Sequence, residues 1–263
     1  MQPRFPQEVI DDLIDWVSVS PTGQADPNLR SCSLVSRNWV QRSRQHLFYS
    51  IDLASTTDIN NWIRNVRPGV GGVSGHVRRL WLNSSWGKWS QRFPSVEHLR
   101  SFTHVKELRL TYWCGGQATK EEVEGAFGGF GPSVRSLSVS LPRGDAGSFL
   151  HLISLFPYLD NLSIWSSCLD EGRDPLPKNL VAVRGRLVLD SVQERFADAL
   201  IGGGLRPTFL KISIPRLISY DGLLMACAPS VEIVSLSPTF GQSPPISLRH
   251  RRTTTNFGPR CVS

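Results

Sequence analysis

The residue types most often used in catalysis form no recognisable active site in this sequence. The stretch Gly69–Gly75 has glycines spaced as in a phosphate-binding loop, but it lacks the Lys-Ser/Thr ending and is interpreted as a connector. His76 and His104 each stand just before an apolar repeat position, which explains the pair better than metal ligation does. No H-E-x-x-H, G-x-S-x-G or EF-hand pattern occurs. We therefore expect a non-catalytic protein with no cofactor and no metal.

The arrangement of arginine and tryptophan side chains indicates that the protein binds a partner and does not catalyse a reaction. Several of them lie between the apolar positions of strand-like segments, so they would share the exposed face of a sheet. Tryptophan and arginine are enriched at binding hot spots. We expect this face to bind a protein target through Arg79, Trp81, Arg109, Trp113 and Trp165. The alternative is a solvated sheet face on which half-buried tryptophans cover the repeat ends.

The strand-like segments recur with the pattern apolar-x-x-apolar-x-apolar, and their central positions are separated by 23 to 29 residues. These central positions are Ile51, Leu80, Leu108, Leu137, Leu162, Leu187, Leu210 and Val234. The pattern resembles degenerate leucine-rich repeats. That resemblance implies an α/β fold: an irregular solenoid in which helices lie on the outer face of a curved parallel sheet.

Helices are predicted between the strands. Thr119 with Glu122, and Ser191 with Glu194, form capping boxes that open helices over 120–127 and 192–201. Asp145 can cap a helix over 146–156, and Ser219 one over 220–228. The competing topology is a doubly wound α/β domain, which would need longer apolar strands and a ligand-binding glycine turn.

The first fifty residues form a separate helical pattern. Pro6 suits a first helical position, and Val9, Ile10, Leu13, Ile14 and Val17 follow at helical spacing. The segment 18–28 contains Pro21, Gly23 and Pro27 and is predicted to be a loop. Two further apolar runs predict two more helices, with Leu29, Leu34 and Val35 in the first, and Trp39, Leu47 and Phe48 in the second.

This N-terminal stretch resembles a fungal F-box. The resemblance rests on Phe5-Pro6 at the position of the family's Leu-Pro opening and on the run Cys32–Trp39, Cys-Ser-Leu-Val-Ser-Arg-Asn-Trp. It implies a three-helix module that docks the Skp-type adaptor of a cullin-based ubiquitin ligase. The adaptor-binding residues that it implies are Phe5, Pro6, Val9, Ile10, Leu13, Ile14, Leu34, Val35 and Trp39. The alternative is a helical cap that packs on the next domain.

Composition and charge limit the partners and the cellular compartments that we expect for this protein. The formal charge is +7 over 263 residues, with −1 in residues 1–55 and +4 in residues 237–263. The basic residues are therefore not concentrated in one aromatic-lined groove, so nucleic-acid binding is not favoured. Five scattered cysteines favour reduced thiols. No apolar run is long enough to span a membrane, and we expect a cytoplasmic or nuclear protein.

The sequence thus predicts three regions: an F-box over residues 1–50, a degenerate repeat solenoid over 51–236, and a basic tail without regular structure over 237–263. The expected function is that of a substrate receptor in a Skp–cullin–F-box ubiquitin ligase, which acts in ubiquitin-dependent degradation. The alternative is a repeat scaffold without a ligase role, whose basic tail contacts nucleic acid or acidic proteins weakly.

Overall fold

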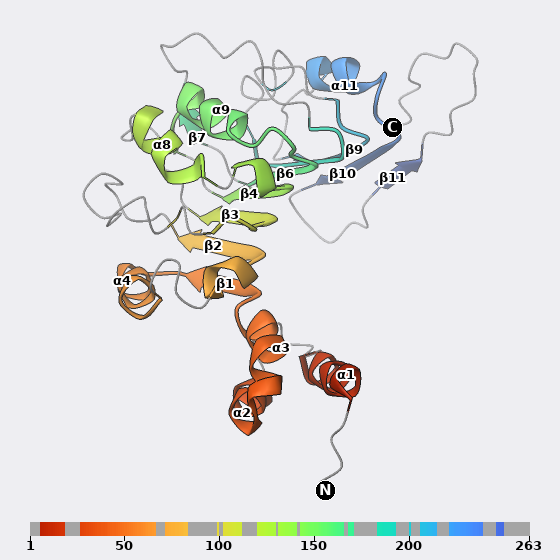
Figure 1. Cartoon of the computed structure of the whole chain (residues 1–263). Coiled ribbons are helices and arrows are strands. Elements are labelled where there is room, and N and C mark those ends of the chain that lie inside the picture. The colour runs from red at the N-terminus through yellow and green to blue at the C-terminus, as the bar shows by residue number, and fades with distance from the viewer. Residues whose placement is uncertain are drawn as a thin grey trace, which may run out of the picture.

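The structure, a computed structural model of the chain, describes residues 6–18, 27–66, 72–83, 99, 102–111, 120–129, 131–140, 143–165, 168–170, 183–192, 200, 206–214, 221–238 and 246–249. Three helices open the chain: α1 (Gln7–Ser18), α2 (Pro27–Val35) and α3 (Arg37–Leu47). We call them the helical module (Figure 1). The loop predicted over 18–28 ends earlier than expected because Pro27 begins α2, where proline's fixed φ suits a first turn.

The rest of the fold is built on one parallel sheet whose strand order follows the chain. A doubly wound sheet would reverse its order at a switch point, so that alternative is excluded. Figure 1 shows the strands stacked one after another above the helical module. The parallel strands are β1 (Ser50–Leu53), β2 (Arg79–Asn83), β3 (Glu107–Thr111), β4 (Ser136–Ser140), β6 (Asn161–Trp165), β8 (Arg186–Asp190), β9 (Phe209–Ile214) and β10 (Ile233–Pro238).

The register confirms the repeat that the sequence predicts. Ile51 pairs with Leu80, Leu80 with Leu108, and the ladder continues position by position to Val234. A second feature also recurs: the carbonyl just before a strand accepts two N–H groups of the next repeat. The oxygen of Asp160, for example, accepts from Gly185 at 3.1 Å and from Arg186 at 2.9 Å. The same double acceptance occurs at Tyr49, Arg78, Lys106, Arg135, Gly185 and Thr208.

The core lies on the face of the sheet that the repeat leucines share. Leu80, Leu108 and Leu137 are fully or almost fully buried there, because alternate side chains of a strand point to opposite faces. Helices cover this face: α4 (Thr56–Asn65), α8 (Lys120–Phe127), α9 (Ala146–Ser154) and α11 (Asp221–Cys227). They contribute Ile59, Val123, Phe127, Phe149, Ile153 and Leu223 to the same cluster.

Short elements complete the described part of the chain. They are α5 (Val73–His76), the 3-10 turn Gly131–Ser133, and two strands that pair with each other, β5 (Arg143–Asp145) and β7 (Cys168–Asp170). Gly72 has a φ of 63°, a left-handed conformation that favours glycine, and it opens α5 within the predicted connector. A capping box between Ser55 and Asp58 starts α4.

Several expectations differ from the structure or fall outside it. The helix predicted over 146–156 ends at Ser154. Within the tail expected to lack regular structure, β10 extends to Pro238 and β11 (Ile246–Arg249) pairs antiparallel with it. Proline is tolerated there because β11 pairs with β10 only from Ile233 to Leu236, so Pro238 needs no N–H to bond β11. Phe5, Trp113 and most of the helix predicted over 192–201 lie outside the described residues.

Candidate interaction surfaces

The helical module has a very small core. Ile10, Ile14 and Leu29 are buried, and Val17, Trp39 and Leu47 pack against them while remaining partly exposed. Ile10 and Ile14 were expected among the adaptor-binding residues. The structure instead buries them between the helices, because they face α2 and α3 at helical spacing. They therefore support a surface and do not line it.

The same module exposes large apolar side chains in two places. The stripe Val9, Leu13 and Trp16 follows one face of α1, and Leu34 with Val35 ends α2. The exposed fraction is 86% for Leu34, 79% for Trp16 and 63% for Val35. We call these five residues the apolar surface. Trp16 was missed from the sequence, although its place three residues after Leu13 on the helix could have identified it.

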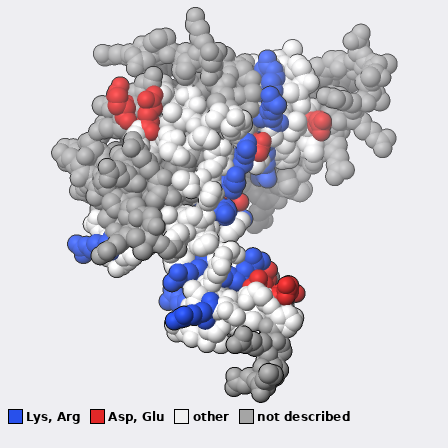
Figure 2. Space-filling model, in the orientation of Figure 1, with Lys and Arg blue, Asp and Glu red and all other residues white. Residues whose placement is uncertain are grey.

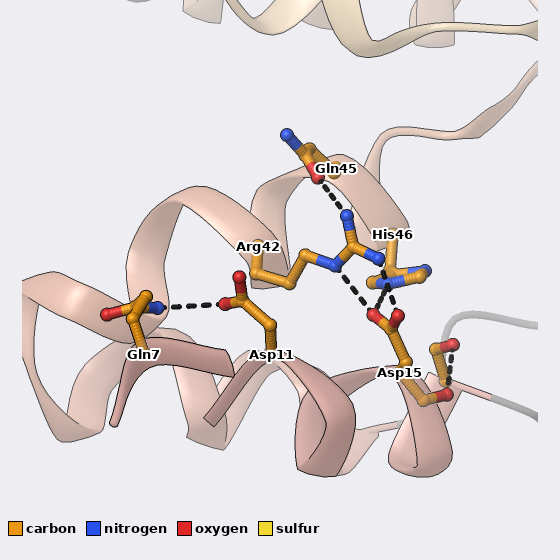
Figure 3. Close-up of polar contacts among 7 residues, drawn as sticks. Gln7, Asp11, Asp15, Arg42, Gln45 and His46 are labelled. Atoms are coloured by element: carbon orange, nitrogen blue, oxygen red, sulfur yellow. Dashed lines mark hydrogen bonds and ion pairs between the residues drawn. The ribbon is translucent and has the colours of Figure 1, made fainter. Parts of the chain in front are cut away.

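A polar cluster ties α1 to α3 and holds the apolar stripe in place. The carboxylate of Asp15 accepts hydrogen bonds from Nε of Arg42 at 2.6 Å and from Nη2 of the same arginine, and lies 2.8 Å from Nε2 of His46 (Figure 3). The hydrogen bond from Arg42 is the largest influence on the Asp15 carboxyl and lowers its pKa to about 2, against a smaller opposing effect of desolvation. Gln7 adds a hydrogen bond to the backbone carbonyl of Asn38.

The helical module is joined to the sheet by packed side chains. Phe48, which follows α3, meets Trp62 of α4 edge-on with ring centroids 6.4 Å apart, and Trp62 stacks on Phe102 at 5.4 Å. Helix α3 also contacts α5. Burial lowers the pKa of His76 in α5, and the charges of Arg78 and Arg44 lower it further. These contacts attach the helical module to the first helices of the sheet region.

The second candidate surface lies on the sheet face opposite the leucines. Four of its five sequence-predicted residues are described, and the structure brings them together over β2, β3 and β6. The guanidinium of Arg109 lies over the Trp81 ring at 5.5 Å and over the Trp165 ring at 5.9 Å. Arg79 lies over the Tyr49 ring at 5.3 Å and pairs with the Glu107 carboxylate at 2.8 Å.

The sequence explains why Arg109 can reach both tryptophans. Trp81 is the Cα partner of Arg109 on the neighbouring strand. Trp165 lies two strands away, at a separation of about 10 Å across the sheet. Strand β4 lies between them and places only serine on this face, at 136, 138 and 140. These short side chains leave room for the Arg109 and Trp165 side chains to meet above β4.

Asp52 borders this group on β1, as the Cα partner of Trp81. Desolvation raises the pKa of its carboxyl, the charge of Asp58 raises it further, and Arg109 lowers it. Within the part of the chain that the structure describes, no ion pair joins Asp52 to Arg109. The positive charge of Arg109 is therefore stabilised mainly by aromatic faces, a favourable arrangement for a guanidinium.

Other site types find no support among the described residues. They contain no group of three or more His, Cys, Asp or Glu side chains that could hold a metal ion. Nor do they include a helix with the length and apolar character that crossing a bilayer requires. No family model matches the chain, and no curated protein matches it.

Proposed function

We propose that this protein is the substrate-receptor subunit of a Skp–cullin–F-box ubiquitin ligase. In this proposal residues 1–50 are an F-box that docks a Skp-type adaptor, and residues 51–236 are a leucine-rich-repeat-like solenoid that holds a protein target. The observation that carries the proposal is the apolar surface: among its described residues the module buries Ile10, Ile14 and Leu29, but it leaves five large apolar side chains 42% to 86% exposed.

Such exposure is costly for a module of this size. Fully burying a Leu or Val side chain is worth about 1.5–3 kcal/mol, so covering the exposed parts of these five side chains would contribute favourably to docking. Exposed apolar side chains that neighbour one another, as along the α1 stripe and at the end of α2, are typical of protein-binding sites. The positions agree with the F-box resemblance, since Leu13, Leu34 and Val35 are among the residues that it implies.

The mechanism needs no chemistry in this chain. A receptor raises the effective concentration of a target lysine near a ligase-borne ubiquitin, and this works only when the geometry allows both to be engaged together. The aromatic contacts from Phe48 through Trp62 to Phe102 support such a role because they limit motion between module and sheet.

The test is calorimetric titration of a purified Skp-type adaptor into the full-length protein and its Leu34→Asp variant. We expect tight binding by the unchanged protein, with a negative heat-capacity change from apolar burial. Leu34→Asp should weaken binding about tenfold or more, because the new carboxylate would have to be desolvated at the interface. Trp16→Ala should weaken it as well, through the loss of a large contact area.

Met225→Asp is the matched control. Met225 is also an exposed apolar residue, but it lies on α11, far along the chain from the helical module. This variant should bind the adaptor like the unchanged protein. Absence of binding by a folded, unsubstituted chain would exclude the ligase-subunit role.

A second candidate is a repeat scaffold whose N-terminal helices only cap the first strand. The packing of Phe48 on Trp62 favours it, because a cap needs such contacts. A cap, however, gains nothing from the exposed Trp16 and Leu34 side chains. The same titration separates the two candidates.

A further inference from the structure

Among the described residues no ion pair balances the charge of Arg109, and the Asp52 carboxylate interacts with it only at longer range. Arg79 is compensated by Glu107 at 2.8 Å, whereas among the described residues no carboxylate pairs with Arg109. Its guanidinium lies over the indole rings of both Trp81 and Trp165. Because a stacked guanidinium has fewer accessible rotamers, less conformational entropy is lost when its N–H groups bind a partner.

Hydroxyl groups lie beside this cation. Ser138 is the Cα partner of Arg109, and Ser163 is the partner of Ser138 on the next strand. Both side chains are partly exposed, and neither has a hydrogen-bond partner within the described ranges. We call Trp81, Arg109, Ser138, Ser163 and Trp165 the Arg109 surface. It combines a planar cation, two hydroxyl groups that can donate hydrogen bonds, and two indole rings.

The charge balance decides which anion fits. A phosphoryl group carries nearly two negative charges and is usually held by several cations. Here Glu107 already compensates the neighbouring arginine, which leaves one guanidinium for the ligand. A carboxylate carries a single charge and matches the fork of one arginine bidentately. The surface is therefore better matched to Asp or Glu than to a phosphorylated residue.

The electrostatic field of the protein also favours an acidic ligand. Of the formal charge of +7, residues 237–263 contribute +4 and residues 1–55 contribute −1, which leaves +4 for residues 56–236. Figure 2 shows Lys and Arg side chains in a band along the strand stack, with fewer Asp and Glu side chains among them. A field of this sign speeds the approach of acidic partners and repels basic ones.

We propose that the Arg109 surface binds a carboxylate side chain in an acidic, extended segment of the target protein. Arg109 holds the carboxylate through two N–H groups, and the Ser138 and Ser163 hydroxyls donate to its oxygens. The indoles of Trp81 and Trp165 fix the guanidinium and pack against the neighbouring target residues. This inference rests on the proposed function, since it specifies the target that the receptor holds.

The test uses the full-length protein and degenerate peptide libraries in which the central residue alone is fixed, as glutamate, glutamine, phosphoserine or lysine. Retention by the immobilised protein should be about tenfold greater for the glutamate library than for the glutamine library, as a charge-assisted hydrogen-bond pair implies. Arg109→Gln should abolish this preference. Arg109→Lys should reduce it several-fold, because an ammonium neither stacks as a plane nor binds bidentately.

Arg186→Gln is the matched control, because Arg186 also stacks on a ring of the same sheet, that of Phe209 at 4.8 Å, but lies on β8. It should keep the glutamate preference. Ser138→Val, which removes a hydroxyl and suits a strand, gives a second measure and should weaken retention several-fold.

Equal retention of the glutamate and glutamine libraries, or an unchanged preference in Arg109→Gln, would overturn the inference. Preferred retention of phosphoserine over glutamate would overturn the choice of a carboxylate. Adaptor titration on the same preparations tests the ligase role separately from the binding of an acidic segment. Adaptor binding without acidic-peptide retention removes only the present inference, whereas peptide retention without adaptor binding removes the ligase role and leaves the Arg109 surface.

Discussion

The helical module and the sheet use apolar side chains in opposite ways. In the sheet, the described residues form one cluster in which Leu80, Leu137 and Leu187 are fully buried. Among the described residues of the module, the buried apolar side chains are Ile10, Ile14 and Leu29, while Trp16 and Leu34 are largely exposed. A repeat region buries its apolar residues against its neighbours, whereas the module retains part of its apolar area for another molecule. The difference separates a self-sufficient framework from a docking element.

The largest expected effect comes from the sheet core. Leu137→Ala should lower the free energy of unfolding by about 2–5 kcal/mol, because it opens a cavity at a fully buried ladder position. Leu34→Ala should change it by about 0.5 kcal/mol or less, since that side chain is already in water. Denaturant titration of both variants measures the contrast. Similar losses for the two would remove the distinction between framework and docking element.

A slightly smaller effect is expected where two repeats approach closely. A Cβ on Gly185 would lie 2.5 Å from the carbonyl oxygen of Asp160, the same oxygen that accepts the Gly185 N–H. Gly185→Ala should therefore cost about 1–3 kcal/mol, as overpacking does. Gly75→Ala is the control, since its Cβ would lie 3.9 Å from the His104 ring. The midpoints of chemical denaturation compare them, and equal midpoints would contradict the close approach.

In the module, acid should weaken the attachment of α1. The folded-state pKa of Asp15 is about 2, below the value near 3.9 of an unfolded chain. The ion pair with Arg42 thus stabilises the fold above about pH 4, and the contribution is lost as the pH falls toward 2. Because the pair is partly exposed, we expect about 1 kcal/mol or less.

Asp15→Asn tests this directly. Its stability deficit relative to the unchanged protein should shrink as the pH falls through the range from about 4 to about 2. Asp12→Asn, a change at an exposed position of the same helix, serves as the control. A deficit that is independent of pH would show that the carboxylate charge of Asp15 does not contribute.

The smallest expected effect is an increase in the stability of the fold. The hydroxyl of Ser43 in α3 is fully buried and has no hydrogen-bond partner among the described residues. Ser43→Ala removes this unsatisfied group and favours the helix, so it should raise stability by about 0.5–1 kcal/mol. Adaptor affinity should stay the same, because the change lies inside the module. A loss of stability, measured by thermal unfolding, would contradict the assignment of Ser43 as unsatisfied.

Sequence periodicity predicted the framework well because one requirement governs it. Each repeat must place a leucine or its equivalent on the same face, so the central positions from Ile51 to Val234 align in one ladder. The helix Lys120–Phe127 was likewise predicted to its ends from a capping box. Strand β11 was not predicted, because Ile246–Arg249 gains its structure only by pairing with β10.

The two surfaces were harder to predict, since exposure depends on packing between helices. Ile10 and Leu13 look equivalent in a helical pattern, yet the first is buried and the second is half exposed, because α2 and α3 cover only one side of α1. The contacts of Arg109 with Trp81 and Trp165 involve residues spread over a span of four strands. They depend on the short serine side chains of β4, whose position between Arg109 and Trp165 follows only from the strand order.

Hydrogen–deuterium exchange with and without a Skp-type adaptor tests the central contrast most directly. In the free protein the amides of α1 and α2 should exchange much faster than those of β3 and β4, because few apolar contacts hold the module together. Adaptor should slow exchange in α1 and α2 and leave β3 and β4 unchanged. Exchange that is equally slow in both regions and unaffected by adaptor would contradict the account, and the helices would then be a cap.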